Sequence, residues 1–279
     1  MSLLKLPEIH ADARLKTVAF DMRTDAVERW TPGVRAATSD DSSISVYDTI
    51  GESWDGSGVT AKRIAAALRS IGENPVTVNV NSPGGDFFEG VAIYNLLREH
   101  PAKVTVRVLG LAASAASVIA MAGDEILMGD GAFFMVHNAW AVAVGNQHDM
   151  RAAAALLAPF DDAMAGLYAK RTGADKAHVA KLMDAETWLG AEASIDEGFA
   201  SGMVDSAEIK NNASASTANK PLALIESIMA KAGCTRGARR DLLKSMFAAM
   251  PSAGDKSPMP SAGDEIAATL QTLIATLKT

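Results

Sequence analysis

The chain has 279 residues, of which 48% are hydrophobic, and its formal net charge is −7. This length and apolar content suffice for one sizeable domain, with or without appendages. A negative charge without a large Lys/Arg cluster argues against nucleic acid and against an anionic membrane surface as binding partners. Cys234 is the only cysteine, which excludes an internal disulfide and a multi-thiolate metal site.

The remaining sequence features point to a soluble protein without a cofactor. None of the five histidines stands in a metal-binding spacing such as HExxH, so we expect no metal and no organic cofactor. The N-terminal residues lack the apolar region of a secretory signal. The longest uncharged runs, 108–123 and 131–147, are shorter than the about 20 apolar residues that span a bilayer. We therefore expect no membrane segment and a cytoplasmic location.

In chain order, residues 1–43 are irregular, with a candidate strand at 16–22 and a loop-like stretch at 31–43. From residue 44 onward, apolar patterns of strand and helix type alternate. The predicted strands are 44–48, 76–80 and 104–108, and the predicted helices are 59–72, which ends at Gly72, and 87–100. This alternation predicts βαβ units and a mainly parallel sheet, hence an α/β fold.

The stretch 104–137 contains the candidate chemistry. The strand at 104–108 is predicted to break at Gly110, and small residues from Ala112 lead into an Ala-rich helix. Ser114 then lies at the helix N-terminus, where free amides and the helix dipole stabilise negative charge. Short strands at 125–128 and 133–136 follow, and the second ends at His137. A Ser and a His in these positions are the parts of an activated nucleophile.

A purely structural interpretation of the same residues also stands at this point. Small residues after a strand allow a helix to pack closely, and a lone histidine is commonly structural. Ser117 lies one turn further into the helix, where its hydroxyl is expected to bond a preceding carbonyl, so Ser114 is the better nucleophile. The turn 81–85 (NSPGG) follows a strand, and its two glycines leave backbone amides uncovered.

The second half of the chain reads as helical. A long helix is predicted over 148–173 with a kink or interruption at Pro159, followed by shorter helices over 175–184 and 191–202 and a closing segment at 203–205. Residues 211–220 read as a polar linker. Beyond it the patterns predict amphipathic helices at 221–233 and 238–250, a flexible segment in which MPSAGD occurs twice (250–255 and 259–264), and a helix at 265–279.

Four segments in this order resemble the ClpP-type serine peptidase family: NSPGG (81–85), GLAAS (110–114), FFMVH (133–137) and AEASIDEGFASGMVD (191–205). The resemblance implies a ClpP/crotonase-like spiral of βαβ units over residues 44–206. It leaves an N-terminal arm at 1–43, and a linker with a helical, partly disordered tail at 207–279.

The resemblance also implies site residues. Ser114 takes the place of the nucleophile and His137 that of the general base. The oxyanion donors correspond to the amides of Gly85 and Ala115. The family's third residue is usually Asp. Counting back from Trp188-Leu189 places Glu186 there, with Asp184 two residues earlier as the reserve candidate.

Within that family, the additional N-terminal and C-terminal segments and the 185–198 stretch resemble phage and prophage head-maturation proteases more than housekeeping peptidases. This implies a homo-oligomeric ring that cleaves polypeptides such as scaffold or coat proteins, with or without an ATPase, in host cytoplasm or inside a procapsid. Two alternatives remain: a non-catalytic capsid-assembly protein on the same fold, and a crotonase-type acyl-CoA enzyme. The latter would leave Ser114 and His137 without a role.

Overall fold

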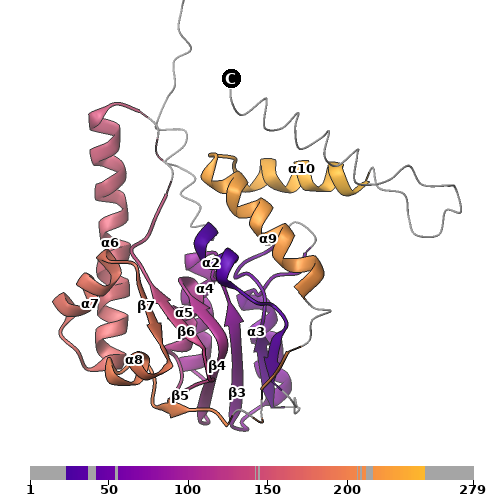
Figure 1. Cartoon of the computed structure of the whole chain (residues 1–279), viewed down its shortest axis with the longest axis vertical. Coiled ribbons are helices and arrows are strands. Elements are labelled where there is room, and N and C mark those ends of the chain that lie inside the picture. The colour runs from indigo at the N-terminus through magenta and orange to yellow at the C-terminus, as the bar shows by residue number, and fades with distance from the viewer. Residues whose placement is uncertain are drawn as a thin grey trace, which may run out of the picture.

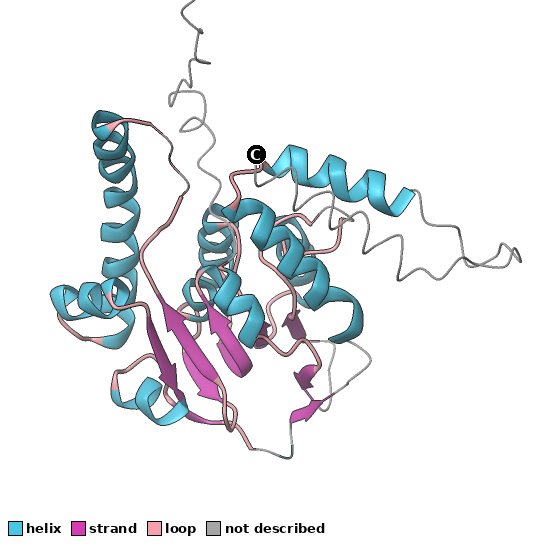
Figure 2. Ribbon diagram, turned by 45° about the horizontal axis from the view of Figure 1, so that its top comes forward, coloured by secondary structure: helices cyan, strands magenta, loops and turns pink. Residues whose placement is uncertain are grey.

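The computed structural model describes residues 23–36, 42–53, 56–141, 143, 145–205, 207, 209–211 and 216–248. The predicted strand at 16–22, the MPSAGD repeat and the predicted helix at 265–279 lie outside the described residues. Within them, a seven-stranded sheet has the order β2-β3-β4-β5-β8, and β6 connects β4 to β7 (Figures 1 and 2). Its pairs are parallel except β6–β7, which confirms the predicted mainly parallel sheet.

The first βαβ units form where the apolar patterns predict them. The elements are β2 (Ser43–Val46), α3 (Ala61–Ile71), β3 (Val76–Ser82), α4 (Phe87–Arg98) and β4 (Val104–Ala113). Side-chain caps fix the helix starts, since Thr60 accepts from the Arg63 amide and Asp86 accepts from the Glu89 amide. Gly72 ends α3 with φ 71°, as predicted.

The predicted break at Gly110 is wrong, because β4 runs through this residue to Ala113. β3 carries an irregularity between Val80 and Ser82, and there the Asn81 side chain replaces a backbone partner. Asn81 Oδ1 accepts from the Leu111 amide at 3.1 Å. A Cβ on Gly110 would lie 2.8 Å from that same oxygen. The glycine therefore gives room for the asparagine and does not end the strand.

β4 changes partner along its length, and this positions the site. Residues 105–108 pair with β5 (Glu125–Met128), whereas residues 111–113 pair with β6 (Phe133–Val136). The chain turns directly from Ala113 into α5 (Ala115–Ala120), which is entirely buried. β6 also pairs with β7 (Thr187–Gly190), so the ends of three strands lie side by side.

The helices after β6 partly follow the predictions. α6 (Gln147–Thr172) is one helix of 26 residues that contains Pro159, so the predicted interruption does not occur. α6 extends well beyond the sheet at one side of the molecule (Figure 1). α7 (Lys176–Asp184) matches its prediction, whereas α8 (Ala191–Asp196) is shorter than the predicted 191–202 because a turn at Gly198 leads into β8 (Gly202–Met203).

Segments at both ends of the described chain pack together. α2 (Thr24–Arg29) and β1 (Val34–Ala36) precede the sheet, and β1 pairs antiparallel with β9 (Ile209–Asn211). Two expectations need correction here, since 34–36 is a strand within a predicted loop and 216–220 belongs to α9 (Ser216–Lys231). The predicted tail helices exist as α9 and α10 (Arg236–Ala248). α2 and α9 lie beyond the carboxyl ends of β3 and β4 (Figure 1).

Two apolar clusters hold these layers together. The larger one lies between the sheet and α3–α7 and includes Tyr168, Phe134 and Phe199. The smaller cluster joins α2 and α9 to the strand ends beside the site, and its buried members are Ala26, Val27, Trp30, Leu111, Ala113, Met135 and Ala223. The backbone that leads to Ser114 and His137 is therefore packed against segments from both ends of the described chain.

Candidate active site

Ser114 occupies a strained strand-to-helix turn. It is the N-cap residue of α5, with φ 55° and ψ −125°, a conformation that L-residues rarely adopt. Its amide donates to the Met135 carbonyl at 2.9 Å, which ties the turn to β6. A non-glycine residue persists in such a conformation when the surrounding structure holds it there, and such residues cluster at functional sites.

His137 follows β6 directly and faces this turn. Its Nε2 lies 2.8 Å from Ser114 Oγ, within hydrogen-bond distance. The side chain is buried, and burial lowers the pKa of His137 to about 4, assisted by the nearby Arg23 cation and partly offset by the Glu186 carboxylate. The imidazole is therefore neutral at pH 7. In the tautomer protonated at Nδ1, Nε2 can accept the Ser114 proton.

The glycine turn is held against Ser114 by residue 50. The Ile50 amide donates to the Gly84 carbonyl and the Asp86 amide donates to the Ile50 carbonyl, both at 2.9 Å. Since these groups face Ile50, the Gly85 amide between them faces the opposite side. A Cβ on Gly84 would lie 2.7 Å from Ser114 Cβ, so only glycine allows the turn to approach the serine this closely.

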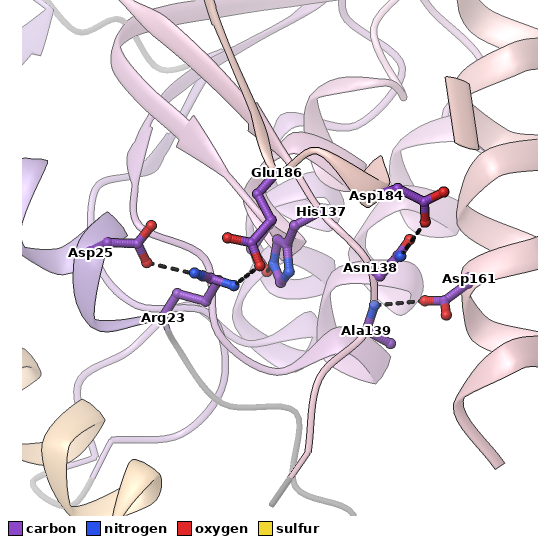
Figure 3. Close-up of polar contacts among 9 residues, drawn as sticks. Arg23, Asp25, His137, Asn138, Ala139, Asp161, Asp184 and Glu186 are labelled. Atoms are coloured by element: carbon purple, nitrogen blue, oxygen red, sulfur yellow. Dashed lines mark hydrogen bonds and ion pairs between the residues drawn. The ribbon is translucent and has the colours of Figure 1, made fainter. Parts of the chain in front are cut away.

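Neither carboxylate candidate is hydrogen-bonded to His137. Among the described residues, His137 Nδ1 has no hydrogen-bond partner although it is buried. Glu186 lies beside the imidazole, but its Oε1 accepts from Arg23 Nη1 (Figure 3). Asp184 accepts from Asn138 Nδ2 at 2.7 Å and points away from the imidazole (Figure 3). The structure thus brings Glu186, and not Asp184, to the side of the histidine.

Glu186 also has an unusual backbone conformation. Its φ is 49°, at the turn between α7 and β7, where glycine or asparagine is the usual residue. A glutamate in the left-handed region costs about 1 kcal/mol. With this backbone conformation, the Glu186 side chain lies next to His137. The strained backbone is therefore found where a carboxylate is placed beside the imidazole.

The residue one helical turn after Ser114 supports the turn. Ser117 Oγ donates to the Ser114 carbonyl at 2.5 Å, which confirms the predicted bond to a preceding carbonyl. It also lies 2.8 Å from the Tyr168 hydroxyl of α6. Burial raises the pKa of Tyr168 to about 12, so this phenol stays neutral.

Sequence reasoning missed three residues that shape the site. Arg23 contacts Glu186, Asn81 holds the strand that leads to Ser114, and Tyr168 supports Ser117. Of these, only Asn81 carried a signal, because a polar residue next to a valine-rich strand indicates a buried hydrogen-bonding role. Arg23 lies 163 residues from Glu186 in sequence, and no local pattern identifies this contact.

A family comparison agrees with this geometry. Residues 37–207 match the family model described as Clp protease. The chain belongs to the Clp protease family. The matched region of the Clp protease fold includes Ser114, His137 and Glu186, whereas α2, β1, β9 (after residue 207), α9 and α10 lie outside it.

Curated relatives of this Clp protease family member are similar over part of its length. An ATP-dependent Clp protease proteolytic subunit 2 of Treponema denticola is 33% identical over 129 residues, covering 46% of this chain and 64% of the relative. A proteolytic subunit of Leuconostoc citreum is 30% identical over 133 residues, covering 46% and 66%. The chain thus spans just under two thirds of the length of these relatives.

A solved structure gives the same fold. ClpP1 of Listeria monocytogenes, in a mutant form, has a TM-score of 0.51 and 21% identity, and the match covers 63% of this chain and 95% of that one. This confirms the predicted ClpP-like α/β fold. In the described part of the chain, no helix is long and apolar enough to cross a bilayer.

Proposed function

We propose that this Clp protease family member is a serine endopeptidase with Ser114 as nucleophile and His137 as general base. The observation that carries the proposal is the 2.8 Å approach of His137 Nε2 to Ser114 Oγ at a strained turn. His137 takes the hydroxyl proton while Oγ attacks the peptide carbonyl carbon. It then returns this proton to the leaving amine, and water hydrolyses the acyl-enzyme by the same route.

The oxyanion of the tetrahedral intermediate is stabilised by two backbone amides in this proposal. The Gly85 amide faces away from Ile50, and the Ala115 amide starts α5. A Cβ on Gly84 would lie 2.7 Å from Ser114 Cβ and 3.2 Å from the Ala115 nitrogen, so the turn that carries the Gly85 amide lies close to the start of α5. Donors that are fixed before the reaction stabilise the developing charge without reorganisation.

Glu186 completes the triad in this proposal. It is the carboxylate beside His137, and a shift of its side chain would bring it to the unpartnered Nδ1. Asp184 is engaged by Asn138 instead. We therefore expect Glu186→Gln to lower activity more than Asp184→Asn, a matched loss of charge two residues away. Equal losses in the two variants would contradict this assignment.

Digestion of a denatured protein tests the peptidase function. Purified chain is incubated with an unfolded polypeptide, and new N-termini are identified by mass spectrometry. We expect cleavage by the wild type and by Ser117→Ala, and none by Ser114→Ala or His137→Ala. Cleavage that persists in Ser114→Ala would refute the assignment, and would assign the activity to another residue or to a contaminant.

The narrower proposal is a homo-oligomeric phage head-maturation protease that acts on scaffold or coat proteins. The resemblance of 185–198 to that branch and the helices outside the family match support it. Exposed apolar side chains on α4 and α6, namely Phe88, Met150 and Leu156, supply candidate subunit contacts. Intact mass after expression tests self-processing. Loss of the tail in the wild type but not in Ser114→Ala supports it, and identical masses refute it.

A further inference from the structure

Arg23 lies outside the family match and reaches the candidate triad. It immediately precedes α2, and its guanidinium bonds both Asp25 Oδ1, at 2.9 Å, and Glu186 Oε1. Burial opposes the charge on this arginine, but the two carboxylates outweigh it and raise the pKa of Arg23. The same pairing lowers the pKa of Asp25 against the effect of burial. The Arg23–Asp25 pair is therefore held in its charged form beside Glu186.

This contact leaves the histidine incomplete. A triad carboxylate accepts the Nδ1–H of the histidine and stabilises the imidazolium that forms during the reaction. Here the Glu186 oxygen is bonded by Arg23, and within the described structure no carboxylate is hydrogen-bonded to the buried Nδ1 of His137. Arg23 and His137 thus compete for one carboxylate.

We propose that Arg23 is a positioning residue that holds the Glu186 carboxylate off His137 and thereby keeps the triad open. The inference rests on the proposed function, because it concerns how fast Ser114 reacts. When Arg23 leaves, Glu186 turns to Nδ1 and the triad closes. Arg23 is therefore a brake on the reaction and does not contact the reacting atoms.

The terminal elements hold this brake in place. Trp30, just after α2, is fully buried and donates from Nε1 to the Asn81 carbonyl at 2.9 Å. From α9, Lys220 Nζ donates to the Glu28 carbonyl at 2.6 Å, and Ala223 packs in the cluster that contains Trp30. Displacement or removal of α9 would loosen α2 and with it the contact of Arg23 with Glu186.

The charges that face His137 come from two elements. Arg23 and Asp25 belong to the α2 segment, and Glu186 belongs to the turn before β7. Loss of the Arg23 cation removes a charge that disfavours imidazolium and frees a carboxylate that favours it. Both changes move the acid limb of Ser114 reactivity to higher pH in Arg23→Met than in the wild type.

The rate of Ser114 modification by a fluorophosphonate tests the proposal without a known substrate. We expect Ser114 to react roughly tenfold faster in Arg23→Met than in the wild type. This is the effect of removing one charge-assisted hydrogen bond, that of Arg23 to Glu186, which competes with His137 for the carboxylate. Glu186→Gln in the same chain should abolish the gain, because the gain requires the carboxylate. Arg98→Met is the matched control, since Arg98 pairs with Asp124 at 3.0 Å on the surface away from the site.

The outcomes separate this inference from the proposed function. A rate for Arg23→Met that equals or falls below that of the wild type overturns the brake and leaves the peptidase assignment intact. If Ser114 is modified neither in the wild type nor in Arg23→Met, the peptidase assignment itself is overturned. If Arg23→Met does not fold, Arg23→Lys, which keeps the charge but not the planar fork, should still react faster than the wild type. A slower or equal rate in that variant overturns the brake.

Discussion

His137→Asn is expected to change how stability depends on pH. The buried imidazole is neutral in the folded chain, with a pKa of about 4 against 6.5 for an exposed histidine. Between these values the unfolded chain binds a proton that the folded chain does not, so stability falls as the pH falls from 6.5 towards 4. A difference of about 2.5 pH units corresponds to about 3 kcal/mol of unfolding free energy.

Urea unfolding at pH 7 and pH 4 measures this effect. Other groups titrate as well, so the relevant quantity is a difference between two proteins. We expect the unfolding free energy lost between pH 7 and pH 4 to be about 3 kcal/mol larger in the wild type than in His137→Asn. His178→Asn is the control, because His178 is exposed and pairs with Glu197, and its loss should match the wild type within about 1 kcal/mol. Equal pH dependence in wild type and His137→Asn would refute the buried neutral imidazole.

Three further substitutions test the backbone around the site by urea unfolding. Ser114→Gly should raise the unfolding free energy by about 1 kcal/mol or more over Ser114→Ala, because only glycine relieves the φ of 55°; equal values would contradict the strain. Gly84→Ala should cost about 3 kcal/mol more than Gly72→Ala. Both glycines have positive φ, but only at Gly84 would the Cβ meet backbone, at 2.6 Å; similar costs would contradict the close approach. Asn81→Ala should cost about 2–4 kcal/mol, because the Leu111 amide loses its buried acceptor; a cost below about 1 kcal/mol would contradict that role.

The sequence predicted the strands and helices of the sheet region because these elements are determined by local apolar periodicity. It also offered Ser114 and His137 as the parts of an activated nucleophile, and the resemblance to the ClpP-type family implied their roles. The predicted break at Gly110 was wrong for a non-local reason. The space that the glycine opens is filled by Asn81, which accepts from the Leu111 amide 30 residues later in the chain.

The third position of the triad shows the limit of sequence reasoning most clearly. Spacing pointed to Glu186, and the structure places that side chain beside His137. The contact with Arg23 joins residues 163 positions apart. Such a contact depends on how α2 and α9 pack against the strand ends, and no periodicity within either segment encodes that arrangement.

Fluorophosphonate treatment of the folded protein, followed by peptide mapping, tests the central claim most directly. If Ser114 is an activated serine, it is the single modified residue in the wild type, and it reacts faster in Arg23→Met. The modification is lost in His137→Ala. Modification at another residue, or none in either folded chain, would contradict the assignment of Ser114 as an activated nucleophile.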